Sequence, residues 1–523
     1  TKDFSGNAVT VSDGDNVRLS NVAQTSQTTI SAGSAGDNTL NLNLRVNADD
    51  LKVTDGDFGT VNLDVENNDD TNDPRAIGTT SNFGANTTVN VTGSDDLDIG
   101  NVTADVIDAN GFTGALTAEL SGTNGDITGG SGDDVFSSIG NAAATVSGGE
   151  GEDEFTIAAE GNDVTINGGA DTDTVKLGTG VNLDFSDDAG TPAALDLNGV
   201  EILDFDGGSM LTVDGSEIDG ADLIVRSTGG TNDTFTVNLG STPSVDLSNL
   251  TVNTGEVDVV VNGTGVSDTV TGSNDGDLVD AKGGDDEVNA GAGQDEVLGK
   301  GGADTINGGA GNDNQDLNSD STFGLQGGAG DDSIDGGAGD DILVGGADSD
   351  TLTGGTGDDE FVFNAFANDN GNVITDFTAG GTEDSISGLD TQVSDSTATG
   401  DITSTGTFNE NEIDGGDVTA DNGLEIVVDG SSTGNTANSL SEADVATFLG
   451  DVDGEGNGFV DNDSTDAVFF VGVTDGTDTG IFAVEEANDG AAISENELTD
   501  VVTLQGVSDP TNLTADDFAG FTA

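Results

Sequence analysis

The sequence predicts an all-β protein, built as a parallel β-solenoid or β-roll with flanking β-rich segments and a small mixed carboxy-terminal region. A nine-residue repeat that runs from Gly263 to Val362 is the first reason. The second is that short segments of alternating apolar and polar residues recur elsewhere in the chain, as half-buried strands require. The third is that proline, which interrupts strand ladders, occurs only 4 times in 523 residues.

The repeat is clearest from Gly327 to Val362, which reads GGAGDDSID, GGAGDDILV, GGADSDTLT and GGTGDDEFV. Its template is G-G-x-G-x-D-x-U-x, where U is a large apolar residue. The glycines predict a tight turn whose carbonyls are free to face an ion. The apolar eighth residue predicts a short strand in a narrow core. One turn cannot bury that residue alone, so we expect the turns to stack. A flexible Gly/Asp linker would not keep an aliphatic residue at every ninth place.

The sixth-position Asp supplies a hard carboxylate, and Ca²⁺ takes six to eight oxygen ligands. We therefore expect several calcium ions, and we expect this block to fold only when they bind. Gln315 breaks the apolar rule, and Leu317 to Gln326 reads as an insertion before the register resumes at Gly327. In the first repeats other residues replace some of the template glycines, so we expect weaker calcium sites there. The predicted ligands in the block are Asp268, Asp277, Asp286, Asp295, Asp304, Asp313, Asp332, Asp341, Asp350 and Asp359.

A diluted form of the template occurs earlier, at Gly129 to Phe136, Gly148 to Phe155 and Gly168 to Val175. The three starts are 19 and 20 residues apart, about two nonapeptides. This spacing predicts rungs with a calcium turn on one edge only, the other edge being closed by ordinary loops. Three unrelated Gly/Asp turns are the alternative. The predicted ligands, aligned along one edge, are Asp134, Asp153 and Asp173.

The remaining segments read mostly as strands. Residues 177–262 keep the strand pattern without the template. They are either a continuation of the solenoid or an inserted β-domain. Ser441 to Leu449 predicts a helix, and Ala467 to Val484 predicts a hairpin around Asp475 and Gly476. Before the template, a solenoid is favoured over a β-sandwich; its expected strands include Thr39 to Leu44, Thr60 to Val65, Thr87 to Val91, Leu97 to Ile99 and Ala115 to Leu120. The expected divisions are 1–125, 126–176, 177–262, 263–362 and 363–523.

Composition narrows the function. The chain has 101 acidic and 9 basic residues, a formal charge of -92. About a dozen calcium ions would cancel roughly 24 of these charges. Nucleic acid is excluded as a direct partner, since phosphate binding needs Lys and Arg. Without Cys or His, the chain can form neither a disulfide nor a thiolate or imidazole metal site. No apolar run approaches the length of a membrane span, and no amino-terminal secretion signal precedes the strands.

Catalysis has little support, and we expect a protein that is not an enzyme. Gly430 to Gly434 fits the nucleophile pattern G-x-S-x-G, but no His is present to act as the base. Zinc-protease and phosphate-loop motifs do not occur. Asp451 to Asn462 resembles the start of an EF-hand loop, with Asn462 in place of the bidentate Glu, so a weak calcium loop and a solvated turn both stay open.

The nonapeptides resemble the RTX family of calcium-dependent proteins exported by type I secretion. Asp359 to Phe377 with Asp384 to Leu389 resembles the strand pair that closes RTX blocks. Val501 to Phe521 resembles the family's carboxy-terminal secretion-target region, with a short helix around Asp516 to Phe518. The resemblance implies export by the type I secretion machinery, an extracellular location at the cell surface and multiple bound Ca²⁺.

Within that family the chain most resembles the surface-layer proteins, whose subunits tile into a lattice. The resemblance implies that it assembles with copies of itself, and an outer-surface polysaccharide is a candidate anchor. Two alternatives stay open. One is an RTX adhesin or biofilm-matrix protein, which would carry immunoglobulin-like repeats of about 100 residues. The other is the carrier portion of a secreted enzyme whose catalytic domain precedes Thr1.

Overall fold

The chain forms two compact units, residues 1–242 with 249–260 and residues 243–248 with 261–523. The computed structural model describes strands alone within residues 1–79, parts of 468–518, and most of 80–388. The gaps in the last range are 84–86, 121–125, 140–143, 160–163, 187–194, 230–232, 254–256, 315–323, 364–370 and 380–383. Within the described residues the single helix is α1 (Gly215–Ile218), and every other element is a strand. None of this helical structure has the length and apolarity needed to span a bilayer.

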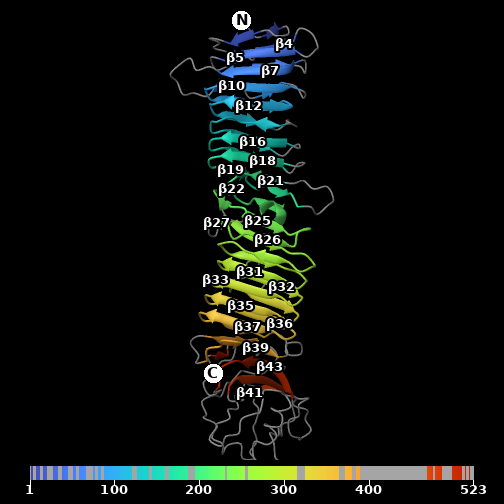
Figure 1. Cartoon of the computed structure of the whole chain (residues 1–523), viewed down its shortest axis with the longest axis vertical. Coiled ribbons are helices and arrows are strands. Elements are labelled where there is room, and N and C mark those ends of the chain that lie inside the picture. The colour runs from blue at the N-terminus through green and yellow to red at the C-terminus, as the bar shows by residue number, and fades with distance from the viewer. Residues whose placement is uncertain are drawn as a thin grey trace, which may run out of the picture. The chain divides into compact units, whose positions relative to one another are not determined.

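The first unit is a β-solenoid in which strands of successive rungs pair in parallel (Figure 1). One sheet has the order β1 (Lys2–Asp3), β3 (Asn16–Leu19), β5 (Asn38–Leu44), β7 (Phe58–Val65), β10 (Thr88–Gly93), β12 (Val106–Phe112), β14 (Ile127–Thr128), β16 (Ala144–Glu150), β18 (Val164–Ala170) and β21 (Leu195–Asn198). A second has the order β27 (Thr251–Val252), β24 (Ile224–Ser227), β22 (Ile202–Phe205), β19 (Thr174–Leu177), β17 (Glu154–Ile157), β15 (Val135–Ile139), β13 (Leu116–Glu119), β11 (Leu97–Thr103) and β8 (Arg75–Ala76), and β9 (Thr80–Asn82) also pairs with β11. Shorter rows are β2 (Ala8–Val11), β4 (Thr28–Ala32) and β6 (Leu51–Thr54), and β20 (Asn182–Asp184), β23 (Met210–Asp214) and β25 (Asp233–Asn238).

The second unit repeats this architecture with two parallel rows of strands; β28 (Val257–Asn262) contains the division between the units. One row is β30 (Asp277–Asp280), β32 (Glu296–Gly301), β34 (Leu325–Ala329), β36 (Ile342–Ala347), β38 (Glu360–Val362) and β40 (Ser385–Ser387). The other is β26 (Ser244–Asp246), β29 (Thr269–Thr271), β31 (Glu287–Ala292), β33 (Thr305–Ala310), β35 (Ser333–Ala338), β37 (Thr351–Thr356) and β39 (Asn372–Ile374), and it ends in β43 (Leu498–Leu504), β42 (Thr479–Glu485) and β41 (Val468–Thr474). These last three pair antiparallel with one another.

The core of each unit is a stack of side chains from equivalent positions of successive rungs. In the second unit Val288 pairs with Ile306, which pairs with Ile334, and all three are at most 2% exposed. In the first unit the rings of Phe136 and Phe155 stack with centroids 5.7 Å apart. Burial of each such side chain stabilises the fold by about 1.5–3 kcal/mol. Because every rung contributes only a few of them, a single rung could not fold alone.

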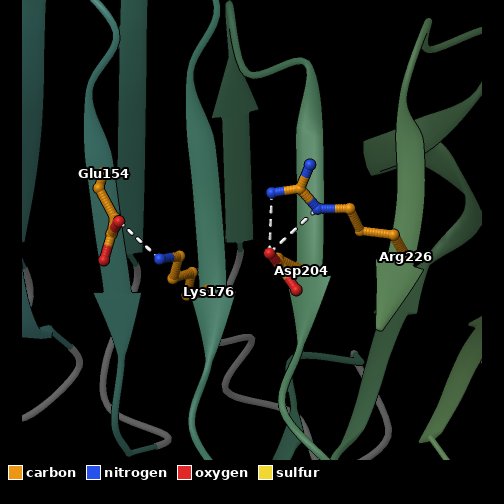
Figure 2. A network of polar contacts seen from close by, with 4 residues as sticks. All are labelled: Glu154, Lys176, Asp204 and Arg226. Carbon is orange, nitrogen blue, oxygen red and sulfur yellow. Dashed lines mark hydrogen bonds and ion pairs between the residues drawn. The ribbon is translucent and has the colours of Figure 1, made fainter. Parts of the chain in front are cut away.

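Two kinds of polar contact hold the outward faces of the first unit in register. Asn62 donates to Asn41 at 2.7 Å and accepts from Asn90 at 2.8 Å, one rung on either side. Further along, Lys176 pairs with Glu154 at 2.6 Å, and Arg226 pairs with Asp204 at 2.9 Å (Figure 2). The second pair matters most, since Asp204 is only 2% exposed. These contacts need no ion.

The structure confirms the β-solenoid, and with it the strands expected between residues 39 and 120. Residues 177–262 continue the solenoid, because β22 pairs in parallel with β19 and β24 rather than forming an inserted domain. The hairpin expected from Ala467 to Val484 is confirmed as antiparallel β41 and β42. The helix expected at Ser441 to Leu449 lies outside the described residues, as does Asp516 of the expected final helix. Phe518 forms an isolated parallel bridge with Ile386.

One predicted register is wrong. The insertion was placed after the apolar position of its nonapeptide, from Leu317 to Gln326. Instead, Leu325 takes that apolar position, because it pairs with Val297 on one side and Leu343 on the other and is fully buried. The register therefore resumes before Gly327. The physical reason is core burial: Leu325 occupies the apolar position in the core, where the side chain of Gln315 would bury a polar amide.

Candidate calcium-binding turns

The ten predicted Asp residues of the second unit form two rows, one on each edge of the solenoid. Each nonapeptide supplies one turn and one strand, so successive nonapeptides alternate edges and one rung takes 18 residues. Within a row, the backbone amide of each Asp donates to Oδ1 of the next Asp, at 2.7–3.0 Å. We call these rows the first ladder (Asp268, Asp286, Asp304, Asp332 and Asp350) and the second ladder (Asp277, Asp295, Asp313, Asp341 and Asp359).

The three predicted Asp residues of the first unit align in the same way and form the sparse ladder. The amide of Asp134 donates to Asp153 at 2.7 Å, and the amide of Asp153 donates to Asp173 at 2.9 Å. The alignment of these three turns along one edge, predicted from spacings of 19 and 20 residues, is confirmed. All thirteen Asp residues of the three ladders are at most 2% exposed.

The glycines of the template make room for the carboxylate. A Cβ placed on Gly336, the first residue of its nonapeptide, would lie 2.6 Å from Oδ2 of Asp341 and 2.7 Å from the carbonyl oxygen of Gly354. The carboxylate of one turn and a carbonyl of the next rung therefore converge on the same small volume. Gly337 beside it has a φ of 100°, in the region that favours glycine. Two convergent hard oxygens, one of them charged, are a donor set that suits Ca²⁺.

The second carboxylate oxygen of these residues has no protein partner. Oδ1 accepts the amide of the preceding rung, but Oδ2 is buried and accepts no hydrogen bond. This holds at eight positions: Asp153, Asp173, Asp286, Asp295, Asp304, Asp313, Asp332 and Asp341. An unpaired buried charge is costly, and a row of such oxygens beside backbone carbonyls fits bound divalent cations. No cluster of three or more acidic, His or Cys side chains occurs among the described residues, so backbone carbonyls would complete each shell.

The electrostatics agree with this interpretation. Burial removes water from the carboxylates and raises the pKa of Asp153 and Asp295 to about 8. Burial likewise raises the pKa of Asp277, Asp313, Asp332 and Asp359 to about 7 and that of Asp134, Asp173, Asp286 and Asp341 to about 6. Neighbouring Asp residues of a ladder add to several of these shifts through charge repulsion. A bound cation would reverse both effects, since it favours the charged carboxylate.

Three members of the ladders were missed from the sequence because they lie outside the glycine template. Asn372 accepts the amide of Asp350 at 2.8 Å, and Asp384 accepts that of Asp359 at 3.3 Å. In the sparse ladder, Glu201 accepts the amide of Asp173 at 2.8 Å. A shorter signal would have found them: a side-chain oxygen two residues before a buried apolar residue, as in Asn372–Ile374 and Asp384–Ile386. The nucleophile-like Gly430 to Gly434 and the EF-hand-like Asp451 to Asn462 lie outside the described residues.

Comparison with known proteins identifies the dense block. A family model described as the RTX calcium-binding nonapeptide repeat, in 4 copies, matches residues 262–297, 295–314 and 326–361. A comparison with curated proteins found no match. The matched residues contain both ladders of the second unit, and repeats of this family bind multiple calcium ions and are typical of secreted proteins. The sparse ladder lies outside the match, although its geometry is the same.

Proposed function

Because the chain is an RTX repeat protein, we propose that it is an extracellular structural protein whose copies assemble into a calcium-dependent layer at the cell surface. Export by type I secretion machinery and attachment to an outer-surface polysaccharide are part of this proposal. The support for export is the family and the carboxy-terminal resemblance. The support for assembly is the distribution of charge over the edges of the solenoid.

The observation that carries the proposal is a second, exposed row of carboxylates beside the buried ladders. In several turns the residue before the ladder Asp is exposed, and its side chain accepts the amide of the equivalent residue on the next rung. Asp340 accepts from Asp358 at 3.0 Å, and Asp331 accepts from Ser349 at 3.1 Å. We call the acidic residues at this position the outer row, two on each edge: Asp285 and Asp331 beside the first ladder and Asp340 and Asp358 beside the second, all exposed.

On each edge the carboxylates of the outer row lie at multiples of the spacing between rungs, which is about 4.8 Å. Asp340 and Asp358 are on adjacent rungs, and Asp285 and Asp331 are two rungs apart, with Ala303 between them. These carboxylates are exposed, so a cation can reach them from solvent and bridge them to a second molecule. Such a bridge is needed. Ten ions bound inside the turns would cancel roughly 20 charges, and the formal charge of the chain is -92. Two copies therefore repel one another unless further cations neutralise the facing edges.

Inside the turns we propose the ladder Asp residues with unpaired oxygens, together with Asp350 and Asp359 of the same ladders, as the calcium ligands. The bound ion supplies positive charge between carboxylates that would otherwise repel one another. The chain supplies the rest: a fixed Oδ1 acceptor, a carbonyl from the next rung and glycines that leave the space open. Binding and folding of the block are then one event.

A chelator titration of the full-length protein tests the proposal. Light scattering would follow assembly, and circular dichroism would follow β structure. We expect scattering to fall at a higher free calcium concentration than the loss of β structure, because intermolecular sites have fewer fixed ligands. Magnesium at the same ionic strength is the control for simple screening. A protein that stays monomeric at high calcium and high concentration would overturn the assembly proposal and favour a secreted carrier module.

A further inference from the structure

The first turn of each ladder differs from all the turns that follow it. In the sparse ladder, the amide of Gly130 donates to Oδ2 of Asp134 at 2.8 Å. In the first ladder, the amide of Thr264 donates to Oδ2 of Asp268 at 2.6 Å, and the amide of Ser273 does the same for Asp277 in the second ladder. We call these closed turns, because the second residue of the nonapeptide caps the carboxylate of its own turn.

Later turns are open. Their second residue has a positive φ, as at Gly149 (124°), Gly309 (105°) and Gly337 (100°), and its amide no longer meets the carboxylate. The unpaired Oδ2 atoms described above all belong to open turns, and neither Asp134, Asp268 nor Asp277 is among them. Even lysine accepts this unfavourable backbone in two open turns, where Lys282 has a φ of 75° and Lys300 of 72°.

Hydroxyl groups complete the closed turns of the second unit. Thr264 Oγ1 donates to Oδ1 of Asp268 at 2.9 Å, and Ser273 Oγ donates to Oδ1 of Asp277 at 3.0 Å. Both carboxylate oxygens of each Asp are thus hydrogen-bonded within one turn. Glycine at these positions could not do this, since it has no hydroxyl. Gly130 closes the turn of the sparse ladder with its backbone amide alone, so the hydroxyls reinforce a closed turn rather than create it.

A protein cation reinforces the first closed turn of the second unit. The Lys282 ammonium, from the next rung of the same edge, donates to the carbonyl oxygen of Gly263 at 2.8 Å. Gly263 is the first residue of the closed turn that contains Asp268, and in open turns the equivalent carbonyl faces the carboxylate of the preceding rung. Positive charge is therefore supplied to this turn by the chain itself.

We propose that Asp134, Asp268 and Asp277 are caps rather than calcium ligands, and that the closed turns fold without the ion and present a preformed rung to which the calcium-dependent open turns add. The far ends of the ladders also differ from the open turns: Asn372 carries a neutral amide in place of a carboxylate, and Oδ2 of Asp384 accepts the amide of Thr378 at 2.6 Å. Ion binding is thereby confined to the interior of each ladder. The inference rests on the assignment of calcium to the open turns, and not on self-assembly.

Calcium stoichiometry of the full-length protein tests the inference with matched variants. Asp268→Asn and Asp277→Asn should bind as many ions as the wild type, measured by calorimetry. Asp304→Asn and Asp313→Asn, the same change in open turns of the same two ladders, should each bind about one ion fewer. Loss of an ion in Asp268→Asn and Asp277→Asn would overturn the inference.

Amide hydrogen exchange in excess chelator gives a second readout that does not depend on how the variants fold. In the wild type, amides of residues 264–277 should stay protected, while those of 286–313 exchange freely. Equal exchange in both segments would also overturn the inference. A wild type that binds no calcium would instead contradict the proposed function, so the two failures are distinct.

Discussion

The backbone amide of Asp313 donates a 2.8 Å hydrogen bond to Oδ1 of Asp341, although 28 residues separate them. The preceding step of the same ladder, from Asp295 to Asp313, takes 18 residues with the same 2.8 Å distance. The additional residues therefore leave the stacking of turns unchanged. The contact between adjacent turns therefore determines the stacking, whatever the length of chain between them, as expected of a solenoid.

Removal of calcium should unfold the open turns selectively. In excess chelator we expect amides of β35 and β36 to lose protection from hydrogen exchange and circular dichroism to lose part of its β signal. Buried carboxylates without a cation repel one another, and the thin core cannot overcome chain entropy alone. Amides of β10 and β12 are the internal control, because their rungs are held by the Asn41–Asn62–Asn90 contacts. Equal loss of protection in both regions would contradict this prediction.

Asp341→Asn should have opposite effects with and without calcium. At a calcium concentration about 100 times Kd, the loss of one site lowers the free energy of unfolding by about 2.7 kcal/mol. In chelator the same change should stabilise the block, since it removes a buried charge and keeps an Oδ1 acceptor for Asp313. Thermal unfolding in calcium, and the β signal that circular dichroism retains in chelator, check the reversal. The control is Asp340→Asn, one residue earlier and exposed, which should change stability little in either condition.

Acid should stabilise the calcium-free block. Burial raises the pKa of Asp295 to about 8, of Asp332 to about 7 and of Asp341 to about 6, whereas an unfolded Asp titrates near about 3.9. Between about pH 4 and pH 8 the folded state binds more protons than the unfolded state, so the free energy of unfolding rises as the pH falls. Circular dichroism in chelator at pH 8 and pH 6 would measure this, as a recovery of β signal at the lower pH. With calcium present, the same protons compete with the ion, and the calcium midpoint should rise. Stability that falls on acidification in chelator would contradict the assignment.

The strands and ladders could be predicted from the sequence because the template ties three functions to fixed positions. Gly336 opens the turn, Asp341 supplies the carboxylate and Leu343 enters the core, and each role requires its own residue type. The template fails as a guide where a residue outside the nine-residue spacing takes one of these positions. Leu325 was misplaced because an insertion separates it from Asp313, and only its pairing with Val297 reveals the register.

Other features depend on contacts between rungs, which have no local signal. Glu201 joins the sparse ladder because its longer side chain reaches the amide of Asp173. The closed turns also escaped prediction, although Thr264 and Ser273 were visible as departures from glycine. From the sequence, replacement of a template glycine by Thr or Ser suggests only a weaker calcium site. The structure is needed to show which atom the new hydroxyl bonds. For Glu201 and for the closed turns alike, the sequence does not show which atom of the neighbouring rung or turn the side chain contacts.

Neutralising the outer row should abolish assembly and leave the fold intact. We propose the quadruple variant Asp285→Asn, Asp331→Asn, Asp340→Asn and Asp358→Asn. Asparagine keeps the Oδ1 acceptor for the amide of the next rung, so circular dichroism in calcium should match the wild type. The bridging charge is lost, so light scattering should show either monomers or a calcium midpoint for assembly raised at least about tenfold, which corresponds to about 1.4 kcal/mol.

The matched control makes the same change of four charges on exposed residues away from the outer row: Asp105→Asn, Asp108→Asn, Asp184→Asn and Asp222→Asn. If net charge alone governed assembly, both variants would assemble more readily than the wild type, since each reduces self-repulsion. If the outer row bridges copies through calcium, only the control behaves this way and the outer-row variant stays dispersed. The opposite signs expected for the two variants separate specific bridging from general screening. An outer-row variant that assembles like the control would exclude these edges as the contact between copies.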